Sequence, residues 1–146
     1  MSDGIAETVI HEVPTRDGQH TWTLTYRPWD GDHFLRLLID GQEHEAGGGF
    51  DIPAVTEIGF AGGLTPGKGD YILYGLTSSR VARVRAESDD VQHWSEVGTR
   101  EVVAAAGPSD GSPLRCFVLV RPPVDDVRAL VGLDADGQTV QRIVLP

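Results

Sequence analysis

The chain has 146 residues, of which 23% are charged and 40% are hydrophobic, a composition typical of one globular domain rather than of a disordered chain. Its net charge of −10 at pH 7 argues against nucleic acids and anionic membranes as partners, because both would repel it. There is one cysteine, Cys116, and neither a run of membrane-spanning length nor a signal-peptide pattern, so the sequence excludes an intrachain disulfide and a thiolate-rich metal site and predicts a cytoplasmic protein.

Turn-forming residues punctuate the whole chain, with 18 glycines and 9 prolines, as is typical of short strands joined by turns. Residues 1–18 are weakly patterned, and we expect either a flexible N-terminal segment or an edge strand there. The clearest strand covers residues 21–26, where Trp22, Leu24 and Tyr26 alternate with threonines. This alternation predicts an aromatic face packed inward and a hydroxyl face in water.

The N-terminal half is predicted to continue as an antiparallel meander. Residues 33–40 are predicted to form its second strand, with Leu35, Leu37 and Ile39 on one face and turn signals on both sides. Three consecutive glycines at 47–49 are expected to interrupt the sheet, since they supply no packing. We expect a further short strand over residues 55–60 and a loop over residues 62–69, which contain four glycines.

The stretch 71–87 organises the predicted fold. Residues 71–76 form a nearly continuous apolar run, typical of a strand buried on both faces. The hydroxyl side chains of residues 77–79 favour a tight turn or a crossing between sheets. From Arg80 onward the alternation of arginine with alanine and valine indicates a half-solvated strand. A central strand, a crossing and an outer strand together predict the nucleus of a β-sandwich.

Five more strands are expected beyond this stretch, over residues 91–97, 99–105, 114–121, 127–133 and 139–145. The last two are joined by a turn at Asp134-Ala135-Asp136-Gly137 and form a closing hairpin. The pattern as a whole predicts an all-β protein. We expect a single β-sandwich domain over residues 1–146, immunoglobulin-like at least over residues 71–146.

Two motifs in the C-terminal half carry a resemblance to a protein family. They are Leu76-Thr77-Ser78-Ser79-Arg80-Val81-Ala82-Arg83-Val84 and Ala129-Leu130-Val131-Gly132-Leu133-Asp134-Ala135-Asp136-Gly137, with a weaker match at residues 48–53. The chain in this respect resembles small uncharacterised all-β proteins of high-GC bacteria, which share such a strand pair and closing hairpin. The resemblance implies an immunoglobulin-like sandwich and no activity, because these are turn and packing motifs.

Three segments have partial signatures of chemical sites. Residues 62–69 have the glycines and lysine of a phosphate-binding loop, but Gly69 stands where Ser or Thr is needed, and a strand follows instead of a helix. Residues 134–137 begin like a calcium loop but lack its later ligands. Cys116 lies on the same face of its predicted strand as Leu114, Val118 and Val120, and this pattern predicts a core position. We therefore predict no catalytic residues, no cofactor and no enzyme activity.

Acidic side chains are concentrated in the N-terminal half, where residues 1–73 hold 12 acidic and 4 basic side chains against 10 and 8 in residues 74–146. Loops on a β-scaffold commonly carry recognition, and exposed tryptophan is favoured at binding surfaces. In this half, the tryptophan of a predicted turn occurs near several carboxylate side chains. The predicted partner-binding residues are Trp29, Asp30, Asp32, His33, Glu43 and Glu45.

The sequence thus predicts a non-catalytic protein-binding or assembly module for a basic partner, such as an antidote to a basic toxin or an accessory subunit. A homo-oligomer is compatible with this prediction. An alternative is a divalent-metal-binding or metal-dependent domain that uses the loop with Asp30, Asp32 and His33. A competing surface is the stripe of Arg80, Arg83 and Arg85, which would suit an acidic partner or the acidic half of the chain itself.

Overall fold

The computed structural model of the chain describes residues 7–29, 32–48, 57–65, 69–106, 113–124 and 126–145. These residues confirm the all-β prediction, because they form antiparallel strands and one short 3₁₀ turn, η1. No helix in this part of the chain is long and apolar enough to cross a membrane. The elements are β1 Thr8–Pro14, β2 Thr21–Trp29, β3 Asp32–Ile39, β4 Gln42–Gly48, β5 Ile58–Thr65, β6 Asp70–Thr77, β7 Arg83–Ser88, η1 Val91–His93, β8 Ser95–Gly98, β9 Arg100–Ala106, β10 Pro113–Arg121, β11 Val127–Leu133 and β12 Thr139–Val144.

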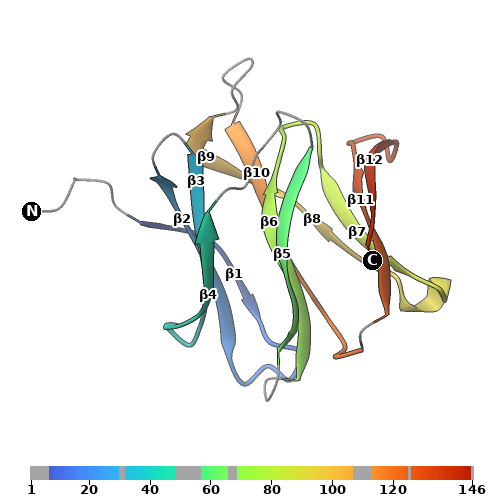
Figure 1. Cartoon of the computed structure of the whole chain (residues 1–146), viewed down its shortest axis with the longest axis horizontal. Helices are drawn as coiled ribbons and strands as arrows, with labels where there is room; N and C mark the ends of the chain where they lie inside the picture. Colours follow the sequence, from blue (N-terminus) through green and yellow to red (C-terminus); the bar gives the residue numbers. More distant parts are fainter. Residues whose placement is uncertain are drawn as a thin grey trace, which may run out of the picture.

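The strands form three stacked sheets, where the predicted sandwich would have two (Figure 1). The first sheet has the order β1-β2-β3-β4, the middle sheet β5-β6-β10-β9 and the third sheet β12-β11-β7-β8. One hydrophobic core lies between the first and middle sheets, and a second lies between the middle and third sheets. The N-terminal meander therefore adds a separate layer to the sheets built by the rest of the chain.

The middle sheet is buried on both faces, which explains the continuous apolar run in its central strand. All eight residues of β6 are buried, which confirms the buried strand predicted over residues 71–76. Ile72, Tyr74 and Leu76 point into the first core, whereas Tyr71 and Leu73 point into the second. Successive residues of a strand face opposite sides, so a strand between two cores must be apolar at nearly every position.

The first sheet confirms the predicted meander. Trp22, Leu24 and Tyr26 of β2 are buried in the first core together with Leu35 and Leu37 of β3. The alternating threonines of β2 fall on the other face of this sheet. The predicted edge strand near the N-terminus is β1, which pairs only with β2.

The chain crosses from the middle sheet to the third sheet between β6 and β7, as predicted for residues 77–79. The Ser78 amide donates to the Glu57 carbonyl at 2.9 Å, and the Val81 amide donates to the Ser78 carbonyl at 3.2 Å. Beyond the crossing, Val84 and Ala86 of β7 face the second core, whereas Arg83 is exposed. This agrees with the predicted half-solvated strand except at Glu87, which is buried.

Glu87 is buried on the outer side of the third sheet beneath two arginines. Its carboxylate accepts a hydrogen bond from Arg85 Nε at 2.9 Å and another from Arg142 Nη1. Burial acts to raise the pKa of Glu87, but the hydrogen bonds and charges of Arg142 and Arg85 outweigh it, so the pKa lies below the usual 4.5. Because the folded pKa is lowered, this carboxylate stabilises the fold above its unfolded pKa, and the stabilisation is lost as the pH falls through the folded value.

Replacing Glu87 by glutamine is expected to lower the free energy of unfolding at pH 7 by about 2 kcal/mol, since it removes charged hydrogen bonds. The deficit should shrink as the pH falls from 4.5 through the lowered pKa of the folded state, because protonation of the carboxylate removes the stabilisation that the wild type has. Urea unfolding at neutral and acidic pH measures both quantities. Glu101→Gln, at an exposed position of β9, is the matched control and should change little. A deficit that is the same at both pH values would contradict the role given to Glu87.

Three segments differ from their predictions. Gly47 and Gly48, which are predicted to interrupt the sheet, belong to β4 and pair with Leu35 and Phe34, because the pairing uses backbone groups that glycine also has. The predicted loop at 62–69 begins later, because Gly62 and Gly63 belong to β5 and pair with Leu73 and Ile72. Their φ angles of 119° and 145° are accessible to glycine but rare for other residues. In the predicted strand 91–97, the first three residues form η1, and β8 begins only at Ser95. The Asp90 side chain accepts a hydrogen bond from the Gln92 amide and caps this turn.

Several predicted features fall outside the described residues. These are most of the N-terminal segment before β1, the segment around the third glycine of 47–49, the start of the strand predicted at 55–60, and the loop between β9 and β10. The hairpin turn at 134–137 is described and confirmed. The Asp134 carboxylate accepts hydrogen bonds from the Asp136 and Gln138 amides, each at 2.9 Å, and Gly137 has a φ of 81°.

Candidate functional site

The predicted partner-binding residues near Trp29 lie at one end of the β2–β3 hairpin. Trp29 pairs with Asp32, and Pro28 pairs with His33. Asp30 and the side chains of Trp29 and Asp32 lie outside the described part of the structure. The His33 side chain is described, and its Nδ1 is 2.8 Å from the Tyr26 hydroxyl.

Glu43 and Glu45 lie towards the opposite end of β3, where they pair with Leu38 and Leu37. At about 3.3 Å per residue, the four or five residues that separate these positions from His33 span roughly 13–17 Å. Glu45 faces the first core and accepts a hydrogen bond of 2.5 Å from the Tyr74 hydroxyl. His33 and the two glutamates therefore lie at separate positions along β3, and the contact surface around Trp29, Asp30 and Asp32 stays a prediction.

The predicted metal loop can be assessed only in part, because Asp30 and the Asp32 side chain are not described. Among the described residues, no group of three or more His, Cys, Asp or Glu side chains is placed to hold a metal ion. Cys116 is fully buried, and burial raises the pKa of its thiol to about 11. The thiolate is the reactive form of cysteine, so this position fits the predicted core role.

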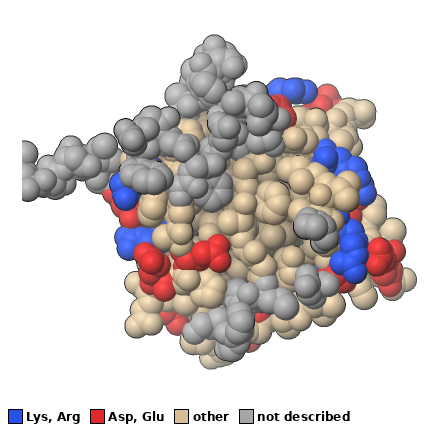
Figure 2. Space-filling view, viewed as in Figure 1, with Lys and Arg blue, Asp and Glu red and all other residues tan. Residues whose placement is uncertain are grey.

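The arginine stripe on β7 and the preceding crossing is matched by glutamates of the same chain. Arg80 Nη1 is 3.1 Å from the Glu57 carboxylate, Arg83 pairs with Glu96, and Arg85 pairs with Glu87. Figure 2 shows Lys and Arg side chains beside Asp and Glu at both margins of the molecule, and few charged side chains in the described middle of this face. The intramolecular pairs offset part of the positive charge that this stripe carries.

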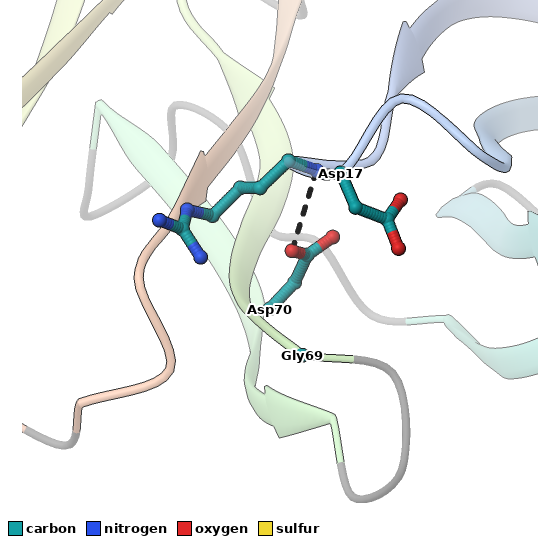
Figure 3. A pocket seen from close by; sticks show the side chains of 4 residues that line it. Asp17, Gly69 and Asp70 are labelled. Carbon is teal, nitrogen blue, oxygen red and sulfur yellow. Dashed lines mark hydrogen bonds between the residues drawn. The ribbon is translucent and has the colours of Figure 1, made fainter.

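A small recess lies beside the turn between β1 and β2, with a cavity of about 280 Å³ lined by Arg16, Asp17, Gly69 and Asp70. Asp70 is buried, and its Oδ2 accepts a hydrogen bond of 2.8 Å from Trp22 Nε1. Figure 3 shows the second bond, from the Arg16 backbone amide to Asp70 Oδ1 at 3.4 Å. These bonds join the first sheet to the middle sheet, so Asp70 has a structural role here.

A second recess, called here the β10–β11 recess, has a volume of about 320 Å³ and lies where η1 and β8 meet the connection between β10 and β11. One wall comes from η1 and the residues after it, and the other from the end of β10 and the residues that follow. Its lining residues are Gln92, His93, Trp94, Ser95, Arg121, Pro122, Val124 and Asp126.

Arg121 joins the two walls of the β10–β11 recess, and only 2% of its side chain is exposed. Its Nη1 donates to the Val124 carbonyl at 3.0 Å and to Asp126 Oδ1 at 2.7 Å, and its Nη2 donates to the His93 carbonyl at 2.9 Å. Its Nε is the one buried side-chain nitrogen or oxygen in the described residues without a hydrogen-bond partner. The guanidinium also lies over the Tyr71 ring, 5.5 Å from its centre.

Asp126 balances the charge of Arg121. Burial acts to raise the pKa of Asp126, but the hydrogen bond and charge of Arg121, with a smaller contribution from His93, lower it below its usual 3.8. His93 Nδ1 lies 3.3 Å from Asp126 Oδ2. The group therefore holds a buried cation and an ionised carboxylate in one fixed arrangement at neutral pH.

Exposed apolar side chains flank this recess. Val124 belongs to its lining, and Val91 begins the 3₁₀ turn whose next two residues line it. Both are largely exposed, as are Pro122 and Pro123. Pocket walls with an apolar rim and a few fixed polar groups are typical of binding sites. The arrangement makes the β10–β11 recess the best candidate functional site in the described residues.

Sequence reasoning missed this site because its two walls are far apart in the chain. Pro122 and Pro123 indicate the end of a strand, and Trp94 falls within a predicted strand. The one available signal was the cluster of prolines, a valine and two aspartates over residues 122–126, a composition typical of an exposed loop.

Comparison with models of known protein families, with curated proteins and with solved structures finds no match to this chain.

Proposed function

We propose that this protein is a non-catalytic module that binds a basic protein partner, as an antidote or accessory subunit would. The observation that carries the proposal is that arginine side chains form ion pairs with carboxylates of the same chain. Seven arginines of the described residues lie in ion pairs with carboxylates of the same chain, namely Arg36, Arg80, Arg83, Arg85, Arg121, Arg128 and Arg142.

These pairs leave the surplus of acidic over basic side chains unchanged, and this surplus gives the chain its net charge of −10 at pH 7. A protein with such a surplus attracts basic partners, mainly by raising the association rate at low salt, and repels acidic ones. The contacts of Arg83 and Arg85 with Glu96 and Glu87 offset part of the positive charge of the arginine stripe, so the stripe attracts an acidic partner less than unpaired arginines would.

We also propose that residues 58–144 form an immunoglobulin-like sandwich that serves as the scaffold. The order β5-β6-β10-β9 corresponds to strands A-B-E-D of that fold, taking the strands in chain order. The order β12-β11-β7-β8 corresponds in the same way to G-F-C-C′. Such a scaffold presents loops at two ends, and loops of this kind commonly carry recognition. The resemblance to small all-β proteins of high-GC bacteria agrees with this scaffold and adds no activity.

Capture of partners from an extract of the native host tests the function. We expect a basic protein to be retained at low salt and released at about 1 M salt, where the Debye length falls to about 3 Å. The captured protein is then purified and titrated into this chain by calorimetry to establish direct binding. Capture of an acidic protein, or binding that is insensitive to salt, would contradict the proposal.

Two sets of substitutions locate the electrostatic surface. The combination Trp29→Ala, Asp30→Asn and Asp32→Asn removes the surface predicted from the sequence, whereas glutamine at Arg80, Arg83 and Arg85 removes the stripe. Loss of the basic partner with the first set, and its retention with the second, would support the hairpin end. The opposite pattern would assign binding to the stripe and contradict the choice of the hairpin end.

A further inference from the structure

We infer that the β10–β11 recess is the contact point for this partner and takes one apolar side chain flanked by basic residues. The inference rests on the proposed function of protein binding and adds the surface and the chemistry of the segment that occupies it. The hairpin end around Trp29 would then contribute longer-range attraction and not the central contact.

The size and lining of the recess favour a side chain over a whole small molecule. Its volume of about 320 Å³ is at the lower end of the range of about 300–1,000 Å³ for small-molecule pockets. Trp94, Pro122 and Val124 supply apolar and aromatic wall surface. Large anchors buried in such pockets commonly dominate the free energy of protein–protein binding.

The recess is held open by hydrogen bonds that do not depend on a ligand. Arg121 bonds to carbonyls on both walls, those of Val124 and His93, and the Trp94 indole donates to the Ser88 carbonyl at 2.9 Å. The guanidinium of Arg85 lies 4.8 Å from the Trp94 ring centre and fixes that ring further. A preformed recess reduces the conformational entropy lost on binding.

The charges around the recess select basic flanking residues. The cation of Arg121 is neutralised by its 2.7 Å contact with Asp126. Asp89 and Asp90 immediately precede η1, and their side chains are 82% and 56% exposed. Asp90 Oδ2 lies 3.9 Å from Nε2 of the lining residue His93, in an exposed pair. Arg128 is 3.5 Å from Asp89 in a solvent-exposed pair, which contributes little to stability and can exchange partners. A lysine or arginine next to the inserted side chain would meet these carboxylates, whereas an acidic segment would be repelled.

The exposed valines fit the same role. Four large hydrophobic side chains of the described residues are exposed: Val9 by 56%, Val91 by 68%, Val124 by 51% and Val144 by 74%. Val124 lines the recess, and Val91 immediately precedes the lining residue Gln92 in the chain. Apolar residues around a central pocket exclude water from the contact and strengthen it.

Three short synthetic peptides provide defined probes. The first has a central leucine flanked by arginines, the second replaces leucine by serine, and the third replaces the arginines by glutamates. Titration of the ¹⁵N-labelled full chain at low salt is expected to shift the amide signals of residues 91–95 and 121–126 with the first peptide only. Equal shifts with the serine peptide would show that charge alone acts. Shifts with the glutamate peptide, or shifts elsewhere in the chain, would overturn the inference.

Matched valine variants separate the recess from the rest of the surface. We expect the pair Val91→Ser and Val124→Ser to weaken binding of the leucine peptide by about tenfold, given the value of apolar burial. The pair Val9→Ser and Val144→Ser removes similarly exposed valines elsewhere and should leave binding unchanged. Because all four side chains are exposed, the variants are expected to fold, and circular dichroism checks this.

The same variants distinguish failure of the inference from failure of the proposed function. If the recess pair still retains the basic protein captured from the host extract with unchanged affinity, the recess is not its contact point and the proposed function stands. If no basic protein binds the wild-type chain but the leucine peptide does, the proposed function fails and the recess remains a peptide-binding site. Loss of both peptide and partner in the recess pair alone supports the inference.

Discussion

Replacing Gly75 by alanine is expected to destabilise the protein by at least about 3 kcal/mol, because the added methyl group has no space. Gly75 lies in the middle of β6 and pairs with Phe60 of β5 and Phe117 of β10. A Cβ atom at this position would lie 1.9 Å from the Gly59 carbonyl oxygen and 2.9 Å from the Phe60 Cα. Both are backbone atoms, so no side-chain rearrangement can relieve the overlap, and β5 would have to move away from β6.

Gly47→Ala is the matched control for this substitution. Gly47 also lies in a strand, and a Cβ atom there would meet nothing within 4 Å. We expect the free energy of unfolding to change by less than about 1 kcal/mol. The change should be an increase, because alanine reduces the entropy of the unfolded chain. Guanidinium unfolding followed by tryptophan fluorescence measures both variants. Equal stability of the two variants would contradict the pairing of β5 with β6.

The second large effect is expected for Asp126→Asn, which should lower the free energy of unfolding by about 3 kcal/mol. The substitution leaves the guanidinium of Arg121, with only 2% of its side chain exposed, without an ionised partner. A buried charge that has lost its counter-charge is much more costly than a missing exposed pair. The same urea or guanidinium experiments give the magnitude.

Asp89→Asn removes a carboxylate from an exposed pair with Arg128 and should cost less than about 1 kcal/mol. Adding Arg121→Met to Asp126→Asn should restore part of the lost stability, because the buried charge is then removed together with its partner. If Asp126→Asn and Asp89→Asn have equally small effects, the hydrogen bonds of Arg121 do not hold the two walls of the β10–β11 recess in place.

The candidate site could be predicted from the sequence only in its general character. The acidic surplus and the absence of a complete catalytic motif are properties of the composition and of short motifs, so they can be read directly from the residues. The position of the recess depends on which distant segments meet, and His93 and Arg121 are far apart in the chain. Likewise, Trp29 and Glu45 are close in sequence, yet the register of β3 with β4 separates them.

The sequence by itself determined the all-β class, most of the strands and their buried faces, since these follow from local alternation and turn residues. The alternation over Trp22, Leu24 and Tyr26 specifies one buried face, and the apolar run in β6 specifies two. Only the tertiary structure decided that three sheets stack, because a buried face does not identify the face that covers it. It also decided the burial of Glu87 and Arg121. Charged residues are predicted to be exposed unless their partners are known, and those partners, Arg142 and Asp126, come from other parts of the fold.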